Sequence, residues 1–417
     1  MLSEEVIDKV VERLVNRIEQ TNTYILTEMG KSVKRIGTIS ASERMQLVQI
    51  LKYGGDYDKI VKKIAEITEK NVYDIYKIFD EVAKHDYIFA KQFYDYRGIK
   101  YIPYSQNLAL QNQIRALASI TAGEYLNLTR TKALGFGLVD KEGNITFKGL
   151  QDTYYDLLDE AVLSVSQGKE TFDSAMYRQL KNIGESGLKV VYENGRTMRL
   201  DSAIRMNMKS ALTNMHMEMQ KQVGKEFDSD GVEISVHNNP AEDHQFAQGR
   251  QFSNEEFDKL QETGQATTYD GMKIDMFKGR SFRPIGEYNC YHYIFTIVLG
   301  VSKPTHSNEQ LQKIIDDNEK GFELDGKHYT MYEGTQMQRQ LETAIRKQKD
   351  EYMIGKAGGN EQLMSESQMK IKALTRRYKE LSEVSGLSIK RERMRVQGYK
   401  KWYLDGIEIL KDGQLST

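Results

Sequence analysis

Apolar residues recur at helical spacing along most of this chain, and that spacing limits its fold more than any other feature. Val6, Val10, Leu14 and Ile18 repeat every four positions, which places them on one face of a helix. Similar spacing continues to about residue 225, and the 417 residues include only four prolines to interrupt it. The pattern predicts a mainly helical protein whose helices pack through apolar stripes.

The expected helices can be bounded by capping residues and glycines. Ser40-Ala41-Ser42-Glu43 forms a capping box that begins a helix, and Gly54-Gly55 ends it. Helices are also predicted over 105–134, 150–167, 172–184, 334–354, 361–384 and 389–403. The tyrosine-rich segment 87–104 can stack on bases, but packing in a core or an interface is the more usual role of such rings.

The spacing of apolar residues changes near residue 189. The runs 189–192 and 197–200 flank Asn194-Gly195, a pair typical of a β-hairpin, and Asp201 is expected to cap a helix reaching about Val223. Strands are expected over 232–236 and 291–298, with a capping box at residues 253–256 and a turn at 269–272 between them. This region predicts a small mixed α+β domain.

The fold class is therefore mainly α with an α+β module, in three parts. We predict a helical N-terminal region over 1–188, an α+β module over 189–305 and a long, helical, basic C-terminal arm over 306–417. Residues 371–403 contain ten basic and three acidic residues, a local net charge of +7. Such an arm can attract nucleic-acid phosphates without reading sequence, or contact an acidic protein, through the following side chains: Arg376, Arg377, Lys390, Arg391, Arg393, Arg395, Lys400 and Lys401. A smaller basic cluster, Arg196, Arg199 and Arg205, is more typical of a surface or of salt bridges.

The net charge and the single cysteine exclude several classes of protein. A net charge of −1 gives the whole chain no general attraction to nucleic acid or to an anionic membrane. Cys290 is the only cysteine, so an internal disulfide is excluded. The first residues are acidic where a secretion signal would be basic, and no apolar stretch is long enough to span a bilayer, so we expect synthesis and folding in the cytoplasm.

Two short segments hold the residues best suited to chemistry. One is His237-Asn-Asn-Pro-Ala-Glu-Asp-His244, and the other runs from Arg283 to His292 and includes Cys290. His237, His244, Cys290 and His292 together would suit zinc, because imidazole and thiolate are ligands that zinc prefers. Three interpretations stay open: a polar cluster that holds a loop in shape, a structural zinc site, or a catalytic site.

The catalytic interpretation has a specific form. A metal-dependent hydrolase or nuclease would use His237, His244, Cys290 and His292 with Asp243 as the nearby carboxylate base. A cysteine nucleophile is a second form, although Cys290 precedes a strongly apolar strand and a buried, inert thiol is the more usual outcome. The chain has no phosphate-binding Gly-x-x-x-x-Gly-Lys loop, and Gly135-Phe136-Gly137 reads as a lone turn, so no nucleotide cofactor is expected.

These segments, taken in order, resemble the phage minor capsid protein 2 family, which is related through its C-terminal region to the Mu F-like head-morphogenesis proteins. The resemblance rests on residues 237–244, Gln248-Gly249-Arg250, Phe252-Ser253, 283–292 and 300–302, and it continues in the hairpin and helix of 189–223 and in 332–349. Tyr291 stands where the family often has arginine, so a basic contact at that position is not expected here.

The resemblance implies a structural minor capsid protein of a tailed bacteriophage and not an enzyme. Such a protein would lie in the virion, in the head interior or at the portal vertex, and act in head assembly and in DNA packaging or delivery. Its implied partners are the portal protein and the capsid shell proteins, with non-specific contact to phage DNA and no membrane in the assembled head. A free-standing nucleic-acid-binding protein is the remaining alternative.

Overall fold

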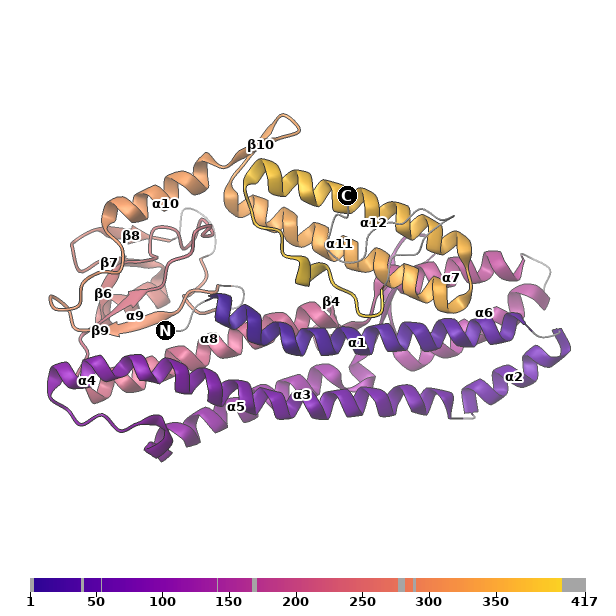
Figure 1. Cartoon of the computed structure of the whole chain (residues 1–417), viewed down its shortest axis with the longest axis horizontal. Coiled ribbons are helices and arrows are strands. Elements are labelled where there is room, and N and C mark those ends of the chain that lie inside the picture. Colours follow the sequence, from indigo (N-terminus) through magenta and orange to yellow (C-terminus); the bar gives the residue numbers. More distant parts are fainter. Residues whose placement is uncertain are drawn as a thin grey trace, which may run out of the picture.

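A computed structural model of the chain describes residues 4–38, 41–53, 55–140, 142–166, 171–276, 282–287 and 290–399. It confirms the predicted fold class, a mainly helical protein with an α+β module (Figure 1). The helices are α1 (Glu4–Gly37), α2 (Ala41–Tyr53), α3 (Asp56–Tyr87), α4 (Lys91–Arg97), α5 (Leu108–Thr129), α6 (Leu150–Ser166), α7 (Phe172–Ser186), α8 (Leu200–Glu226), α9 (Asn254–Thr263), α10 (Asn308–Lys320), α11 (Met331–Gly358) and α12 (Glu361–Ser385).

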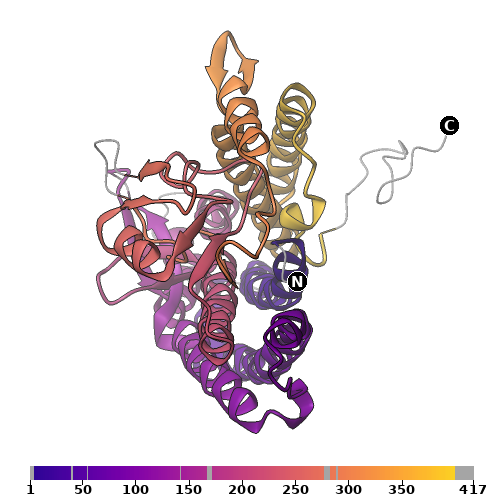
Figure 2. The same cartoon turned by 90° about the vertical axis from the view of Figure 1, so that its left-hand side faces the viewer.

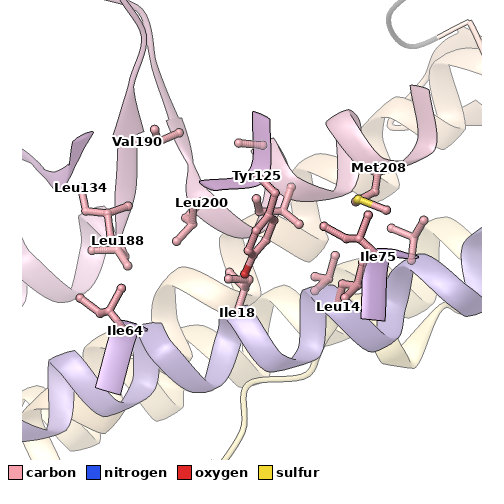
Figure 3. Close-up of a cluster of buried hydrophobic side chains, with 14 of the residues drawn as sticks. Leu14, Ile18, Ile64, Ile75, Tyr125, Leu134, Leu188, Val190, Leu200 and Met208 are labelled. Carbon is pink, nitrogen blue, oxygen red and sulfur yellow. The ribbon is translucent and has the colours of Figure 1, made fainter. Parts of the chain in front are cut away.

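The long helix α1 is the centre of an elongated helical body. It packs against α3 and α8 on one side and against α11 on the other, so it lies between the two halves of the body in Figure 1. Leu14 and Ile18, which the apolar spacing placed on one stripe, are buried in the shared core with Tyr125 and Met208 (Figure 3). Burial of such side chains from α1, α3, α5 and α8 is the main force that holds the body together.

Capping residues and glycines set several helix ends. Gly55 adopts the left-handed conformation, with a φ of 86°, directly before α3. The Asn107 side chain accepts from the backbone N–H of Leu110 at the start of α5, and that of Thr171 caps α7. The predicted cap at Ser40 lies outside the described residues, although α2 begins at Ala41 as that cap would require.

The predicted helix over 105–134 was wrong at its C-terminal end. Helix α5 ends at Thr129, and residues Leu134–Val139 form strand β1, which includes the supposed turn Gly135-Phe136-Gly137. Strand β1 pairs with β2 (Ile145–Gly149) and with β3 (Lys189–Val191), and a side chain at Gly135 would collide with the backbone of Lys148. The two glycines therefore allow close approach of strands, which the local sequence did not indicate.

The hairpin signal at Asn194-Gly195 was correct. Strand β3 pairs with β4 (Thr197–Arg199), and the two complete an antiparallel sheet of order β2-β1-β3-β4. Gly195 has a φ of 79°, as the turn requires. The predicted capping role of Asp201 was wrong, because α8 begins at Leu200 and the Asp201 carboxylate instead contacts two buried arginines, Arg199 and Arg346.

The α+β module covers one end of α8. Its central sheet has the order β6-β5-β9, from Gln251–Ser253, Gly231–Ile234 and Ile294–Ile297, and all of its pairings are antiparallel. Helix α9 and the hairpin of β7 (Gln265–Thr267) and β8 (Lys273–Asp275) pack around this sheet. Ser253 caps α9 as predicted. The Glu256 side chain, however, accepts from the N–H of Thr267 in β7, so the structure shows only the serine half of the predicted capping box.

Hydrogen bonds fix the module on α8. Thr296 of β9 donates from its hydroxyl to the side-chain oxygen of Gln220 at 2.8 Å, and His216 Nε2 lies 2.9 Å from the backbone oxygen of Ile294. The end-on view shows the module beside α8 and next to the helical body (Figure 2). These contacts give the module a defined position on the helical body.

The C-terminal part packs on the helical body. Helix α11 lies against α1, α7 and α12, and its residues Ile345, Tyr352 and Ile354 are buried, so it belongs to the helical body and not to a separate arm. Gly355 lies inside α11, and the helix ends at Gly358 with Gly359 in the left-handed conformation. A short hairpin of β10 (Phe322–Leu324) and β11 (Lys327–Tyr329) joins α10 to α11.

The third helix predicted for the tail was wrong over the described residues. Helix α12 ends at Gly386, which has a φ of 73°, and the following residues run without helix to a single short 3-10 turn, η4 (Arg391–Met394). Arg393, Met394 and Val396 are buried, so this segment is attached to the body by its side chains. Lys400 and Lys401 lie outside the described residues.

The tyrosine-rich segment is a core, as its more usual role predicted. Tyr87, Tyr94 and Tyr104 are buried, and the rings of Tyr87 and Tyr101 stack with centroids 5.2 Å apart. Tyr94 also contacts Phe227 at the end of α8 edge to face. These packed rings thus join α3, α4 and α8 and are not available for bases.

Among the described residues, no helix combines the length and the apolar character needed to cross a bilayer.

Candidate functional site

The loop between β5 and β6 carries His237 and His244, and backbone hydrogen bonds fold it tightly. The N–H of Gln248 donates to the oxygen of His244 at 3.1 Å, and the N–H of Gly249 donates to the oxygen of Ile234 at 2.8 Å. Gly249 has a φ of 68°, and a Cβ there would collide with Leu311 of α10. A glycine is therefore required where the loop returns to the sheet.

The segment before β9 carries Cys290 and His292. Gly286 has a φ of 92°, and a Cβ there would lie 2.6 Å from the sulfur of Met217 in α8. The N–H of Gly286 donates to Cys290 Sγ at 3.3 Å, and the N–H of Cys290 donates to the oxygen of Glu287 at 2.9 Å. This turn directs the thiol toward the loop that carries the histidines.

The structure brings three of the four predicted residues into one buried cluster. Cys290 Sγ lies 3.2 Å from His244 Nδ1 and 3.6 Å from His292 Nδ1, and candidate ligand atoms of the three residues lie within 4.8 Å of one another. The side chains of His244, Cys290 and His292 are all buried. His237 is half-buried beside them, with its ring centroid 4.4 Å from that of His292.

Carbonyl oxygens fix the tautomers of these histidines. His244 Nε2 lies 2.7 Å from the backbone oxygen of Arg283, and His237 Nε2 lies 2.8 Å from that of Tyr291. His292 Nε2 lies 3.2 Å from Gln248 Oε1, an atom that also accepts from the backbone N–H of His237 at 2.8 Å. Because a carbonyl oxygen only accepts, each Nε2 carries a proton, and the neutral rings of His244 and His292 have their lone pair on Nδ1.

Burial determines the protonation states of the cluster. It lowers the pKa of His244, and burial together with the nearby His237 lowers the pKa of His292 well below its usual value, so both rings are neutral near pH 7. Burial also raises the pKa of Cys290 to about 11, although the N–H groups of Gly286 and His292 oppose this. The thiol of the metal-free chain is therefore protonated and is not an activated nucleophile.

The carboxylates near the cluster are occupied or exposed. Asp243 accepts two hydrogen bonds from Arg283, at 2.8 and 3.0 Å, and Glu242 and Glu287 are exposed. Burial acts to raise the pKa of Asp243, but the hydrogen bonds from Arg283 and the positive charge of that side chain hold it below its usual value. A buried cluster whose nearest carboxylate is paired with arginine suits a structural role better than turnover of a substrate.

Gln248 and Arg283 belong to this site, although we did not predict them as site residues. Gln248 orients His237 and His292, while Arg283 orients His244 through its backbone and Asp243 through its side chain. Their proximity in sequence was the only available signal, because Gln248 follows the first histidine-bearing segment by four residues and Arg283 begins the second.

The predicted contact residues of the basic arm have different environments. Arg377 pairs with Asp325 and Glu380, and Arg393 is buried and donates to Asp8 of α1 at 3.0 Å, with Lys390 Nζ 3.8 Å from the same carboxylate. Arg393 therefore serves the fold. Three of the predicted residues have exposed side chains: Arg376, Arg391 and Arg395.

A buried network of charges links the helices of the body. Arg199 lies 3.0 Å from Asp350 of α11, 3.2 Å from Asp201 of α8 and 3.8 Å from Glu19 of α1. Arg205 pairs with Glu12 of α1 in the same interface, so the salt-bridging interpretation is confirmed for these two arginines, whereas Arg196 is exposed. Burial raises the pKa of Glu19 and of Asp350, while Arg199 and Arg346 outweigh burial at Asp201 and lower its pKa.

The fold defines an elongated, mainly helical protein with a small α+β module, and that module holds the buried cluster of His244, Cys290 and His292. Comparison with models of protein families matches residues 2–382 to phage minor capsid protein 2, which covers most of the chain. The chain therefore belongs to the phage minor capsid protein 2 family. Comparisons with curated proteins and with solved structures gave no significant match.

Membership makes the chain a capsid component of a bacteriophage, with other virion proteins as its partners. The family is a structural one, in accord with the expectation that the chain is not an enzyme.

Proposed function

We propose that this chain is a portal-proximal minor capsid protein that acts in head assembly and in DNA packaging or delivery. It would be made in the cytoplasm of the host bacterium and then occupy the head interior or the portal vertex. Its direct partners would be the portal protein and the capsid shell proteins. Family membership over residues 2–382 is the observation that carries this proposal.

An apolar pocket at one end of the body supports docking on a protein partner. The pocket has a volume of about 340 Å³ and lies between α4 and the β9 end of the module. Phe89, Tyr96 and Val301 line it and remain 42%, 59% and 48% exposed. Exposed apolar side chains gathered around a pocket are typical of protein-binding surfaces. We assign this surface to the portal protein.

Portal binding can be measured with the purified portal ring of the same phage and the full-length chain. We expect a complex that survives gel filtration, and the double substitution Phe89→Ser with Tyr96→Lys should weaken binding by at least ~10-fold, as the loss of a central aromatic contact does. Tyr53→Lys is a matched control, because Tyr53 is 77% exposed and lies on α2 at the opposite end of the body (Figure 1).

Two results would contradict the assignment. One is the absence of a complex between the portal ring and the wild-type chain. The other is a complex that the control substitution weakens as much as the double substitution does. Circular dichroism of each variant would check that the fold is retained.

The exposed arginines of the basic arm support an additional, non-specific contact with packaged DNA. Arg376, Arg391 and Arg395 would contact phosphates, so binding should weaken steeply with rising salt. Neutralising all three with glutamine should lower the salt dependence of binding to double-stranded DNA, whereas Arg196→Gln, at an exposed arginine of the β3–β4 turn, should leave it unchanged. An unchanged salt dependence in the triple variant would remove DNA from the proposed contacts.

A further inference from the structure

The cluster of His244, Cys290 and His292 has an unbalanced set of hydrogen-bonding groups. Both imidazoles direct an Nδ1 lone pair at the same sulfur, since their Nε2 protons go to the oxygens of Arg283 and Gln248. A thiol has one proton and can donate it to only one of these two buried nitrogens. A buried acceptor without a donor is unfavourable, so the cluster needs an additional positive group between the three atoms.

The distances between the atoms suit a metal ion. Zinc–sulfur and zinc–nitrogen bonds of about 2.3 and 2.05 Å at a tetrahedral angle separate sulfur from nitrogen by roughly 3.6 Å. The structure gives 3.2 Å from Cys290 Sγ to His244 Nδ1 and 3.6 Å to His292 Nδ1. Small shifts would therefore place both nitrogens and the sulfur at bonding distance from one ion.

The surroundings of the three residues are those of a zinc site. Histidine ligands of zinc usually donate their other ring N–H to a carbonyl or carboxylate, which His244 does to Arg283 and His292 does to Gln248. The N–H of Gly286 donates to the sulfur at 3.3 Å, a contact that favours a thiolate. His237 lies alongside, with its ring centroid 4.4 Å from that of His292.

We propose that His244, Cys290 and His292 bind a structural zinc ion. Binding would release the thiol proton of Cys290 to solvent and leave a thiolate on the metal. The ion would cross-link the β5–β6 loop to the segment before β9, and it would close the part of the module that has little regular secondary structure. This role is independent of the portal assignment.

The direct test measures zinc in the full-length, untagged chain by elemental analysis after equilibration with zinc and removal of excess metal. We expect about one zinc per chain, and a reduction of at least ~10-fold in the variants Cys290→Ser and His292→Ala. His328→Asn is the matched control, because His328 is an exposed histidine of strand β11 and should leave the zinc content unchanged.

Cobalt provides a readout that separates loss of a ligand from loss of the fold. Cobalt(II) in the wild-type chain should give the visible bands of a tetrahedral site and a near-ultraviolet sulfur-to-cobalt band, and Cys290→Ser should lose that sulfur band while circular dichroism remains native.

Substitutions of two glutamines in the same loop provide one more test of the metal site. Gln248→Ala should weaken metal binding about 10- to 100-fold, because it leaves the Nε2 proton of His292 without its acceptor. Gln245→Ala, at a buried glutamine of the same loop whose amide lies 3.4 Å from Glu319, should not.

Wild-type chain that binds no zinc or cobalt under these conditions would overturn the proposal. So would a Cys290→Ser variant that keeps both the metal and the near-ultraviolet band.

Discussion

Replacing Arg199 by methionine should destabilise the whole helical body, because this guanidinium connects three elements through buried carboxylates. Its side chain is 6% exposed and lies 3.0 Å from Asp350, 3.2 Å from Asp201 and 3.8 Å from Glu19. Asp201 would keep Arg346 at 3.0 Å, but Asp350 would keep only the amide of Asn22, at 2.9 Å.

The expected loss in the free energy of unfolding follows from these contacts. Removing one partner of a buried ion pair leaves an uncompensated charge and typically costs about 3–5 kcal/mol, a large share of the roughly 5–15 kcal/mol that stabilises a folded protein. The double variant Arg199→Met with Asp350→Asn removes both charges of the closest pair. It should therefore recover at least about 1 kcal/mol of that loss, as a coupled pair does.

Urea unfolding followed by circular dichroism would measure these differences in the free energy of unfolding. Arg196→Met is the control, because Arg196 is exposed in the turn between β3 and β4 and should change stability by less than about 0.5 kcal/mol. A loss of under about 1 kcal/mol for Arg199→Met, or strictly additive effects of the two substitutions, would refute the role of this network.

Three further predictions test the packing and the electrostatics of the body. Gly30→Ala should lower the free energy of unfolding by about 1–3 kcal/mol, because a Cβ there would lie 2.7 Å from both Ala357 Cβ and the oxygen of Ile354 in α11. Gly123→Ala in α5 is the control: it has open space around it and should be neutral or stabilising in the same urea assay. Gly286→Ala should lower the thermal midpoint through its positive φ and its contact with Met217, and a midpoint equal to that of wild type would contradict the described turn. Burial raises the pKa of Glu351 from 4.5 to about 7, so the folded chain retains this proton more tightly than the unfolded chain. Stability from this group is therefore lost as the pH rises from about 4.5 to about 7, by up to about 1.4 kcal/mol per pH unit, and Glu351→Gln should gain stability relative to wild type at pH 8 but not at pH 5.

The sequence predicted those parts of the fold whose signals are local. The repeat of Val6, Val10, Leu14 and Ile18 identified α1 because a helix brings residues four apart onto one face. Asn194-Gly195 identified the hairpin because the turn needs residues that tolerate a positive φ. Each signal spans only a short stretch of the chain, so helix α1 and the β3–β4 hairpin could be predicted from the sequence alone.

The parts that the sequence did not predict depend on distant partners. Strand β1 pairs with the neighbouring β2 through residues 135–139 and with the distant β3 through residues 134–135, and no local period distinguishes it from the end of a helix. The contact between Arg199 and Asp350 joins positions 151 residues apart, and no sequence spacing predicts that these charged residues are buried. The extended segment after Gly386 likewise depends on the pairing of Arg393 with Asp8.

The candidate site was partly predictable for the same reason. Cys290 and His292 lie two residues apart, and sequence chemistry alone placed them in one set with His237 and His244. The tautomers and the roles of Gln248 and Arg283 required the geometry of the loop, since they depend on which carbonyl oxygen faces which nitrogen.

Quantitative mass spectrometry of purified, DNA-filled phage particles would test most directly that this chain is a structural component placed at the portal. We predict that the chain is retained in the particles in a fixed ratio to the portal protein, and that lysine cross-linking joins it to portal peptides. Particles that lack the chain, or a chain whose amount bears no fixed relation to the portal, would contradict a structural role at the portal.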